Sequence, residues 1–221
     1  MMTEIELLGG IVGSDGHLPN DASTIKIVTG DEEFLNSTLL PLIKRITSKK
    51  ITVRHIDSGF GSKKFIVTFS DRRIKEILHN KLKIPLGKKS NIDIIPEIDN
   101  AKDKLDFVRG WFAGDGSVTT DRNRPRLTIW CNSKGTLEWI QSVLKENCIE
   151  SKIWFAKKRN RWLLTIGKQE SVKKFHEIIE IPHPKKERKL IILLNKKDFG
   201  SSQNQNVVTA CEALPKDVAY C

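Results

Sequence analysis

Hydrophobic and polar positions along the chain repeat one series of patterns twice. Apolar residues at helical spacing fill LLGGIVGSDGHL near the start and FVRGWFAGDGSV near the middle, and alternating runs that predict half-buried strands follow each. When the sequence is aligned with itself at an offset of 100, Gly10 and Asp15 fall on Gly110 and Asp115. The chain is therefore predicted to contain two copies of one unit.

Each copy is predicted to follow the order α-β-β-α-β-β-α. Alternation predicts strands at 22–29, 51–57, 63–70, 124–131, 151–157 and 161–167, and helical spacing predicts helices at 34–46, 71–82, 137–144 and 169–179. Pro41 lies inside the first of these helices, so a kink or break is expected there. The predicted fold class is α+β, with antiparallel sheets related by a pseudo-twofold axis.

The copies are expected to be separate units joined by a short connection. The first repeat is assigned to 1–95, the linker to 96–104 and the second repeat to 105–199. From 200 to 221 the sequence is polar and without pattern, which predicts an appendage outside the core.

Composition places this 221-residue chain among soluble globular proteins, with 38% hydrophobic and 29% charged residues. A net charge of +11 points to a polyanionic partner, and residues 101–221 carry most of the excess. No apolar stretch is long enough to cross a bilayer and the N-terminus is acidic, so an intracellular protein without membrane association is expected, cytoplasmic or organellar. The four cysteines contain no C-x-x-C pair, which argues against zinc.

Small residues four apart occur in both predicted first helices, Gly10 with Ser14 and Gly110 with Gly114. Such spacing lets two helix backbones approach closely. If these helices pack side by side, the carboxylates at their C-terminal ends lie together, and a divalent cation such as Mg²⁺ would relieve their repulsion. The alternative for these carboxylates is helix-capping chemistry in an Asp-Gly turn, without metal.

The segments LGGIVGSDG (8–16) and VRGWFAGDG (108–116) resemble the two signatures of single-chain LAGLIDADG homing endonucleases, and the similarity in element order spans roughly residues 4–195. The resemblance implies a monomer whose paired helices form the seam and whose Asp15 and Asp115 bind Mg²⁺ or Mn²⁺. The carbonyls of Ser14 and Gly114 would complete the ligand sets. Saddle-shaped sheets would lie along the DNA major groove, and hydrolysis of one phosphodiester per strand would leave short 3′ overhangs.

Polar residues that assist the water in this family have partial counterparts here. A late lysine of each copy is expected to organise the nucleophilic water, either Lys88 or Lys89 and either Lys185 or Lys186. The Gln or Lys near the end of the first strand pair is missing or shifted, because Gly30 stands there in copy one and Cys131 or Asn132 in copy two.

Strand alternation assigns a polar face that could contact DNA. Its residues are Thr24, Lys26, Thr52, Arg54, Lys64, Thr68, Arg124, Arg126, Thr128, Lys152, Arg161 and Thr165. Arginine and lysine bind guanine edges or phosphates, although a merely solvated sheet face has the same pattern.

Two functions are compatible with these features. The first is a site-specific, metal-dependent, intron-encoded DNA endonuclease acting at a long asymmetric site on double-stranded DNA. The second is a nucleic-acid binder without efficient cleavage, such as an intron RNA-splicing maturase or a DNA-binding regulator, which the missing polar residues at Gly30 and Cys131 would allow. A self-splicing intein fits less well, since the sequence runs from Met1 to Cys221 without the terminal residues that splicing needs.

Overall fold

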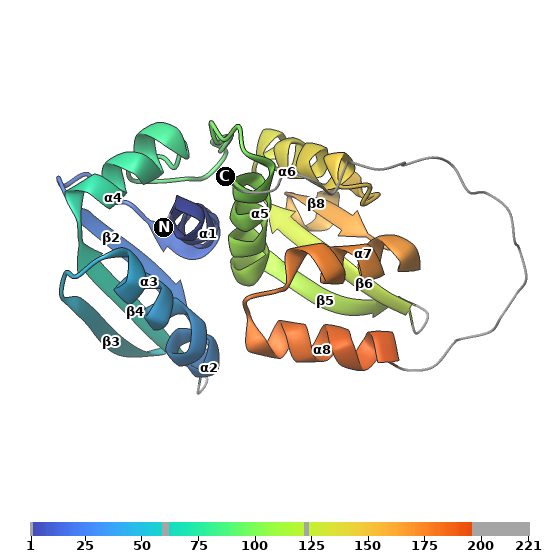
Figure 1. Cartoon of the computed structure of the whole chain (residues 1–221), viewed down its shortest axis with the longest axis horizontal. Helices are drawn as coiled ribbons and strands as arrows, with labels where there is room; N and C mark the ends of the chain where they lie inside the picture. Colours follow the sequence, from blue (N-terminus) through green and yellow to red (C-terminus); the bar gives the residue numbers. More distant parts are fainter. Residues whose placement is uncertain (1, 59–61, 122–123, 196–221) are drawn as a thin grey trace, which may run out of the picture.

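The computed structural model describes residues 2–58, 62–121 and 124–195, and it shows two four-stranded antiparallel sheets with helices packed on one face of each (Figure 1). The strand orders, β1-β2-β4-β3 and β5-β6-β8-β7, are equivalent. The predicted α+β class and two-repeat layout are confirmed. The predicted tail, 200–221, lies outside the described residues.

The first repeat contains α1 (Met2–Asp15), β1 (Gly16–His17), β2 (Thr24–Thr29), α2 (Glu32–Phe34), the π-helical turn η1 (Leu35–Leu39), α3 (Leu40–Ile46), β3 (Ile51–Ser58), β4 (Ser62–Ser70), α4 (Arg72–Glu76) and the π-helical turn η2 (Ile77–Lys81). The second contains α5 (Ala101–Asp115), β5 (Gly116–Asp121), β6 (Arg124–Cys131), α6 (Lys134–Glu146), β7 (Lys152–Ala156), the 3₁₀ turn η3 (Lys157–Arg159), β8 (Arg161–Ile166), α7 (Gln169–Ile179) and α8 (Pro184–Asn195). No helix among these elements is long and apolar enough to cross a membrane.

Local sequence explains two departures from the predicted boundaries. The helix expected at 34–46 is divided into α2, η1 and α3, and Pro41 lies in the first turn of α3, directly after the π-helical turn. The stretch 96–104 is not all linker, because α5 begins at Ala101. Asn100 caps this helix through Oδ1, which accepts from the N–H of Lys102 at 2.8 Å.

The core of each repeat lies between its sheet and its helices. On the inner face of β2, Ile25 and Ile27 are buried, and Leu127 and Ile129 are buried at the equivalent places in β6. The polar residues that alternate with them face the opposite side of the sheet. Alternation thus assigns the core face correctly in both copies, and the outer face is left for function.

The helices α1 and α5 lie side by side and form the seam between the repeats (Figure 1). They run in the same direction, because Gly10 lies against Gly110 and Gly114 lies against Asp15. A Cβ atom built on Gly10 would clash with the Phe107 carbonyl, and one on Gly110 would clash with the Leu7 carbonyl. A Cβ on Gly110 would also lie 3.0 Å from the Cα of Gly10. The two backbones therefore touch where the sequence places glycine in both helices.

A second connection joins the repeats through α8, and we call it the α8 clasp. The Arg188 guanidinium binds both carboxylate oxygens of Glu33, at 2.5 and 2.7 Å, and the Lys185 ammonium lies 2.8 Å from Asp31. The ring of His183 stacks on Phe34 with the centroids 4.7 Å apart. The C-terminal helix of copy two is thereby fixed to α2 of copy one.

We expect Gly110→Ala to lower the free energy of unfolding by about 1–3 kcal/mol, because the new methyl group would force the two helix backbones apart. The matched control is Gly30→Ala, whose Cβ would lie in ordinary contact, 3.6 Å from the nearest atom, the Lys63 carbonyl oxygen. Chemical denaturation of both variants measures the difference. Equal stability of the two variants would show that α1 and α5 do not touch at Gly110.

The clasp also predicts a pH dependence of stability. Burial, with the nearby Lys186 charge, lowers the pKa of His183 to about 4, so the folded protein disfavours the protonated ring. Stability is then lost as the pH falls below the pKa of about 6.5 in the unfolded chain. At about pH 5 we expect His183→Phe to be more stable than wild type by about 1–2 kcal/mol, and at about pH 8 the two should be similar. Identical pH profiles in denaturant titrations would contradict the burial of a neutral His183.

Candidate functional site

The C-terminal ends of α1 and α5 bring two carboxylates together. Asp15 and Asp115 are the last residues of the helices, and Gly16 and Gly116 then begin the first strand of each sheet. A Cβ built on Gly114 would lie 3.0 Å from the Asp15 carboxylate oxygen Oδ2, so the Asp15 side chain reaches across the seam. Asp15 keeps an exposed surface and Asp115 is half-buried. The two acids therefore share one site between the repeats.

Two lysines cap the helix ends. The Lys89 Nζ atom donates to the carbonyls of Val12, Gly13 and Ser14 at 3.0, 2.9 and 2.9 Å. The Lys186 Nζ atom donates to the carbonyls of Phe112, Ala113 and Gly114 at 3.2, 2.6 and 2.6 Å. The last carbonyls of a helix lack intrahelical partners and carry partial negative charge, so an ammonium group is stabilising there.

This geometry decides between the members of each predicted lysine pair. Lys89 and Lys186 occupy equivalent places beside the two acids, whereas the Lys88 side chain is exposed and has no contact with the helix ends. Lys185 contacts Asp31 in the α8 clasp. The structure therefore places neither Lys88 nor Lys185 in the site.

The four charged groups shift one another's protonation. Burial and the neighbouring Asp15 charge raise the pKa of Asp115 to about 6, and burial raises the pKa of Asp15 despite the charges of both lysines. Burial lowers the pKa of Lys89 and of Lys186 to about 8, against the favourable charges of the acids. Shifted pKa values of neighbouring acids and bases are common at functional sites, where burial and like charges are retained because catalysis needs them.

The site is compatible with a divalent cation. In the described part of the chain, no hydrogen-bond donor contacts either side-chain carboxylate, so their oxygens are free for a ligand that relieves their repulsion. The carbonyls of Ser14 and Gly114, the other predicted ligands, already accept from the lysines, and each keeps a second lone pair. Among the described residues no cluster of three His, Cys, Asp or Glu side chains exists, so water or phosphate oxygens would complete the shell.

The positions predicted to lack a polar helper differ in their surroundings. Gly30 is exposed at the end of β2. Cys131 is half-buried and lines a cavity of about 240 Å³ that Lys89 and Asp115 also line, and burial raises the pKa of its thiol. Asn132 lines the same cavity, so copy two has a thiol and an amide there and copy one has neither.

The structure shows a contact between an aromatic ring and an arginine that was not predicted from the sequence. The Arg159 guanidinium lies 4.8 Å from the centroid of the Trp130 ring, a cation–π distance, and both side chains line a cavity of about 520 Å³ with Asp115 and Arg161. Trp130 occupies a polar position in the alternation of β6, which was the available signal. Arg159 lies in a turn, where no periodicity applies.

The predicted DNA-contact residues lie on the outer faces of the two sheets, in three degrees of exposure. Exposed are Lys26, Thr52, Arg54, Lys64, Arg124, Lys152 and Arg161, and half-buried are Thr24, Thr68 and Arg126. Thr128 and Thr165 also belong to this face, but they are only 7% and 6% exposed, so little of either side chain is accessible in this conformation. They are cross-strand partners in the middle of the sheet, where short side chains are covered by their longer neighbours.

Comparisons with known proteins agree with this geometry. Residues 102–180 match the family model of the LAGLIDADG-like domain. A structure of I-DmoI in complex with DNA and Ca is 19% identical, with a TM-score of 0.61 over 80% of this chain and 90% of that one. Further similar structures hold I-DmoI, a homing endonuclease, with DNA and Mn, or with its target DNA in the presence of Mg.

A second group of similar structures is described by a domain rather than by an activity. The N-terminal LAGLIDADG domain of DUF199/WhiA is 21% identical, with a TM-score of 0.59 over 80% of this chain and 81% of that one. Full-length DUF199/WhiA from Thermatoga maritima is 20% identical, with a TM-score of 0.63 over 91% of this chain and 63% of that one. A search of curated protein sequences finds no match. The predicted LAGLIDADG resemblance is thus confirmed, for the second repeat by the family model and for both repeats by the fold.

The electrostatic coupling of the site can be measured directly in metal-free protein. We expect the Asp115 carboxyl to titrate near pH 6, and Asp15→Asn to lower its pKa because one negative neighbour is removed. Lys186→Met should raise the same pKa further, since it removes a positive charge. Carbon-detected NMR titration follows the side chain. An Asp115 pKa near 4 that neither variant changes would contradict the closeness of these groups.

Proposed function

We propose that this chain, whose fold is that of the LAGLIDADG homing endonucleases, is a site-specific endonuclease that cleaves both strands of a long asymmetric DNA site with a divalent cation, Mg²⁺ or Mn²⁺. The observation that carries the proposal is the convergence of Asp15 and Asp115 at the seam of two basic sheets, where no described residue donates a hydrogen bond to either carboxylate. The products would carry short 3′ overhangs. The enzyme would act inside a cell as an intron-encoded monomer, because one chain supplies both halves of the site.

Each residue of the site has a role that follows from its contacts. Asp15 and Asp115 would hold the cation, which when bound supplies Lewis-acid stabilisation of a phosphodiester and lowers the pKa of water. Lys89 and Lys186 fix the helix ends and therefore the positions of both acids. Each Nζ atom has three N–H donors and uses them on three helix-end carbonyls, so the lysines would assist the attacking water through the two acids that they position, with pKa values that burial lowers to about 8.

The outer faces of the sheets support binding to double-stranded DNA. Lys26, Arg54 and Lys64 are exposed on the first sheet, and Arg124, Lys152 and Arg161 are exposed on the second. Basic side chains along strands can neutralise phosphates and reach base edges in the major groove, which admits a β-ribbon. The I-DmoI complexes with DNA show that a protein of this fold binds this partner.

A second candidate function is nucleic-acid binding without cleavage, as an RNA-splicing maturase or a DNA-binding regulator. It is favoured by Gly30, which leaves copy one without a polar side chain at the helper position, and by the similar fold of WhiA, described as a LAGLIDADG domain without a nuclease designation. Arg161, Cys131 and Asn132 line the cavity at Asp115, whereas Gly30 of copy one has no side chain. This asymmetry is compatible with cleavage that is slower on one strand.

Replacing either acid should separate cleavage from binding. We expect Asp15→Asn and Asp115→Asn each to abolish double-strand cleavage of a randomised plasmid library in Mg²⁺, since each variant removes a metal-binding charge. DNA affinity measured in Ca²⁺ should be unchanged or higher, because the lost carboxylate also repels phosphate.

The control for this experiment is Glu177→Gln, which changes an exposed carboxylate on α7 outside the site. It should cleave the library as wild type does. If wild type binds DNA but cleaves no member of the library in Mg²⁺ or Mn²⁺, the binding function is supported instead. Wild-type cleavage rates in either aspartate variant would disprove the assignment of the acids.

A further inference from the structure

Two arginines of β6 lie on the outer face of the second sheet in different surroundings. Arg124 and Arg126 are two positions apart in β6, so both side chains belong to the face of the strand opposite the buried Leu127. Both line a cavity of about 310 Å³ with Asp121 and Gly167. The two arginines differ in their side-chain contacts, and these contacts indicate a different role for each.

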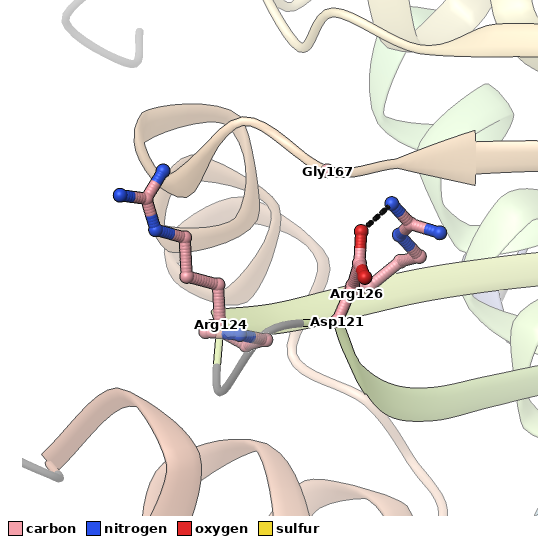
Figure 2. A pocket seen from close by; sticks show the side chains of 5 residues that line it. Asp121, Arg124, Arg126 and Gly167 are labelled. Carbon is pink, nitrogen blue, oxygen red and sulfur yellow. Dashed lines mark hydrogen bonds and ion pairs between the residues drawn. The ribbon is translucent and has the colours of Figure 1, made fainter. Parts of the chain in front are cut away.

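Arg126 is held in a fixed direction. Its Nη2 atom forms an ion pair with Oδ2 of Asp121, which lies diagonally across the β5–β6 pair (Figure 2). On the other side, Gly167 follows β8 without a side chain, and a Cβ there would lie only 3.9 Å from Nε of Arg126. The Thr119 hydroxyl donates to the Arg126 carbonyl at 3.2 Å and holds the backbone as well.

Arg126 keeps donors for a ligand despite this contact. Its side chain is 34% exposed, and its Nε is buried without a hydrogen-bond partner, so the guanidinium is partly buried in the cavity. A guanidinium has five N–H donors, and the ion pair with Asp121 uses one nitrogen. The two N–H groups of Nη1 and the second N–H group of Nη2 therefore have no hydrogen-bond partner among the described residues.

Arg124 differs in every one of these respects. It is exposed, and Figure 2 shows its guanidinium extended away from Asp121 and Arg126. Asp121 is its cross-strand partner by register, yet the carboxylate contacts Arg126 instead. An exposed arginine at a strand end that has no hydrogen-bond or ion-pair partner among the described residues is suited to a phosphate, which demands charge and little geometry.

We propose that Asp121 is a positioning residue that makes Arg126 a guanine-reading side chain of the second repeat, with Arg124 contacting the phosphate backbone; this inference rests on the proposed DNA-binding function. A bidentate contact to guanine O6 and N7 needs a guanidinium of fixed orientation. The Asp121 carboxylate fixes that orientation. Its negative charge also repels phosphate, which directs Arg126 to the uncharged base edge.

The described part of the first repeat has no equivalent ion pair between an aspartate and an outer-face arginine. The cross-strand registers make Thr24 the counterpart of Arg126, and β1, with two residues, is too short to present an acid opposite it. The nearby Asp21 contacts the buried Lys75 ammonium at 3.1 Å. The six-residue β5 of the second repeat is what brings Asp121 into reach, so a guanine-specific position is expected in one half-site only.

The test is selection from randomised DNA duplexes by the full chain in Ca²⁺, followed by sequencing of the bound fraction. Wild type should select one guanine that Arg126→Ala no longer selects. Asp121→Asn should reduce the preference at the same base pair about tenfold or more, with total DNA affinity unchanged or higher. The double variant should resemble Arg126→Ala alone, since Asp121 acts through Arg126. Arg124→Ala should weaken all sequences alike and lower the salt slope by about one unit.

The outcomes separate this inference from the proposed function. If wild type binds selectively while Asp121→Asn keeps the full guanine preference, the inference is overturned and DNA recognition stands. The same holds if Asp121→Asn and Arg126→Ala alter different base pairs. If wild type selects no sequence at all, site-specific recognition fails and the role of Asp121 fails with it. Thermal melts show whether each variant is folded.

Discussion

The backbone contact between α1 and α5 is the constraint on which the rest of the structure depends. Glycine at positions 10 and 110 is required because a Cβ on either helix would enter the other helix's main chain. Glycine inside a helix costs about 1 kcal/mol relative to alanine, so its use at both positions needs the close approach that the seam provides. The seam in turn sets the separation of the sheets and brings Asp15 and Asp115 to one place.

Two carboxylates at one place repel each other, and a lysine from each repeat offsets this repulsion. Lys89 returns from the end of the first repeat to cap α1, and Lys186 returns from the start of α8 to cap α5. Each repeat therefore closes on its own signature helix with a buried ammonium group. The lowered pKa values of the lysines and the raised pKa values of the acids are two sides of this one arrangement. A divalent cation at the acids would complete the charge balance.

Sequence periodicity predicted the element order that the two copies share, the core face of each sheet and the two acids, since these depend on local alternation and on a repeat that is visible at one offset. The additional helix α8 was not among the predicted elements. It could not choose Lys89 over Lys88 or Lys186 over Lys185, because each choice depends on where a loop or helix returns to the seam. The burial of Thr128 and Thr165 was missed because alternation predicts the face on which a side chain lies and does not predict whether neighbouring side chains cover it. The Trp130–Arg159 contact and the pairing of Arg126 with Asp121 join residues whose closeness depends on tertiary register.

The most direct measurement of the central claim is a crystal structure of the protein with a selected duplex and Mn²⁺, using anomalous scattering to locate the metal. The account predicts anomalous density at ligand distance from carboxylate oxygens of both Asp15 and Asp115, between the two helix ends and against phosphate oxygens of the DNA. Manganese bound elsewhere, or a duplex lying away from the seam with both acids unliganded, would contradict it.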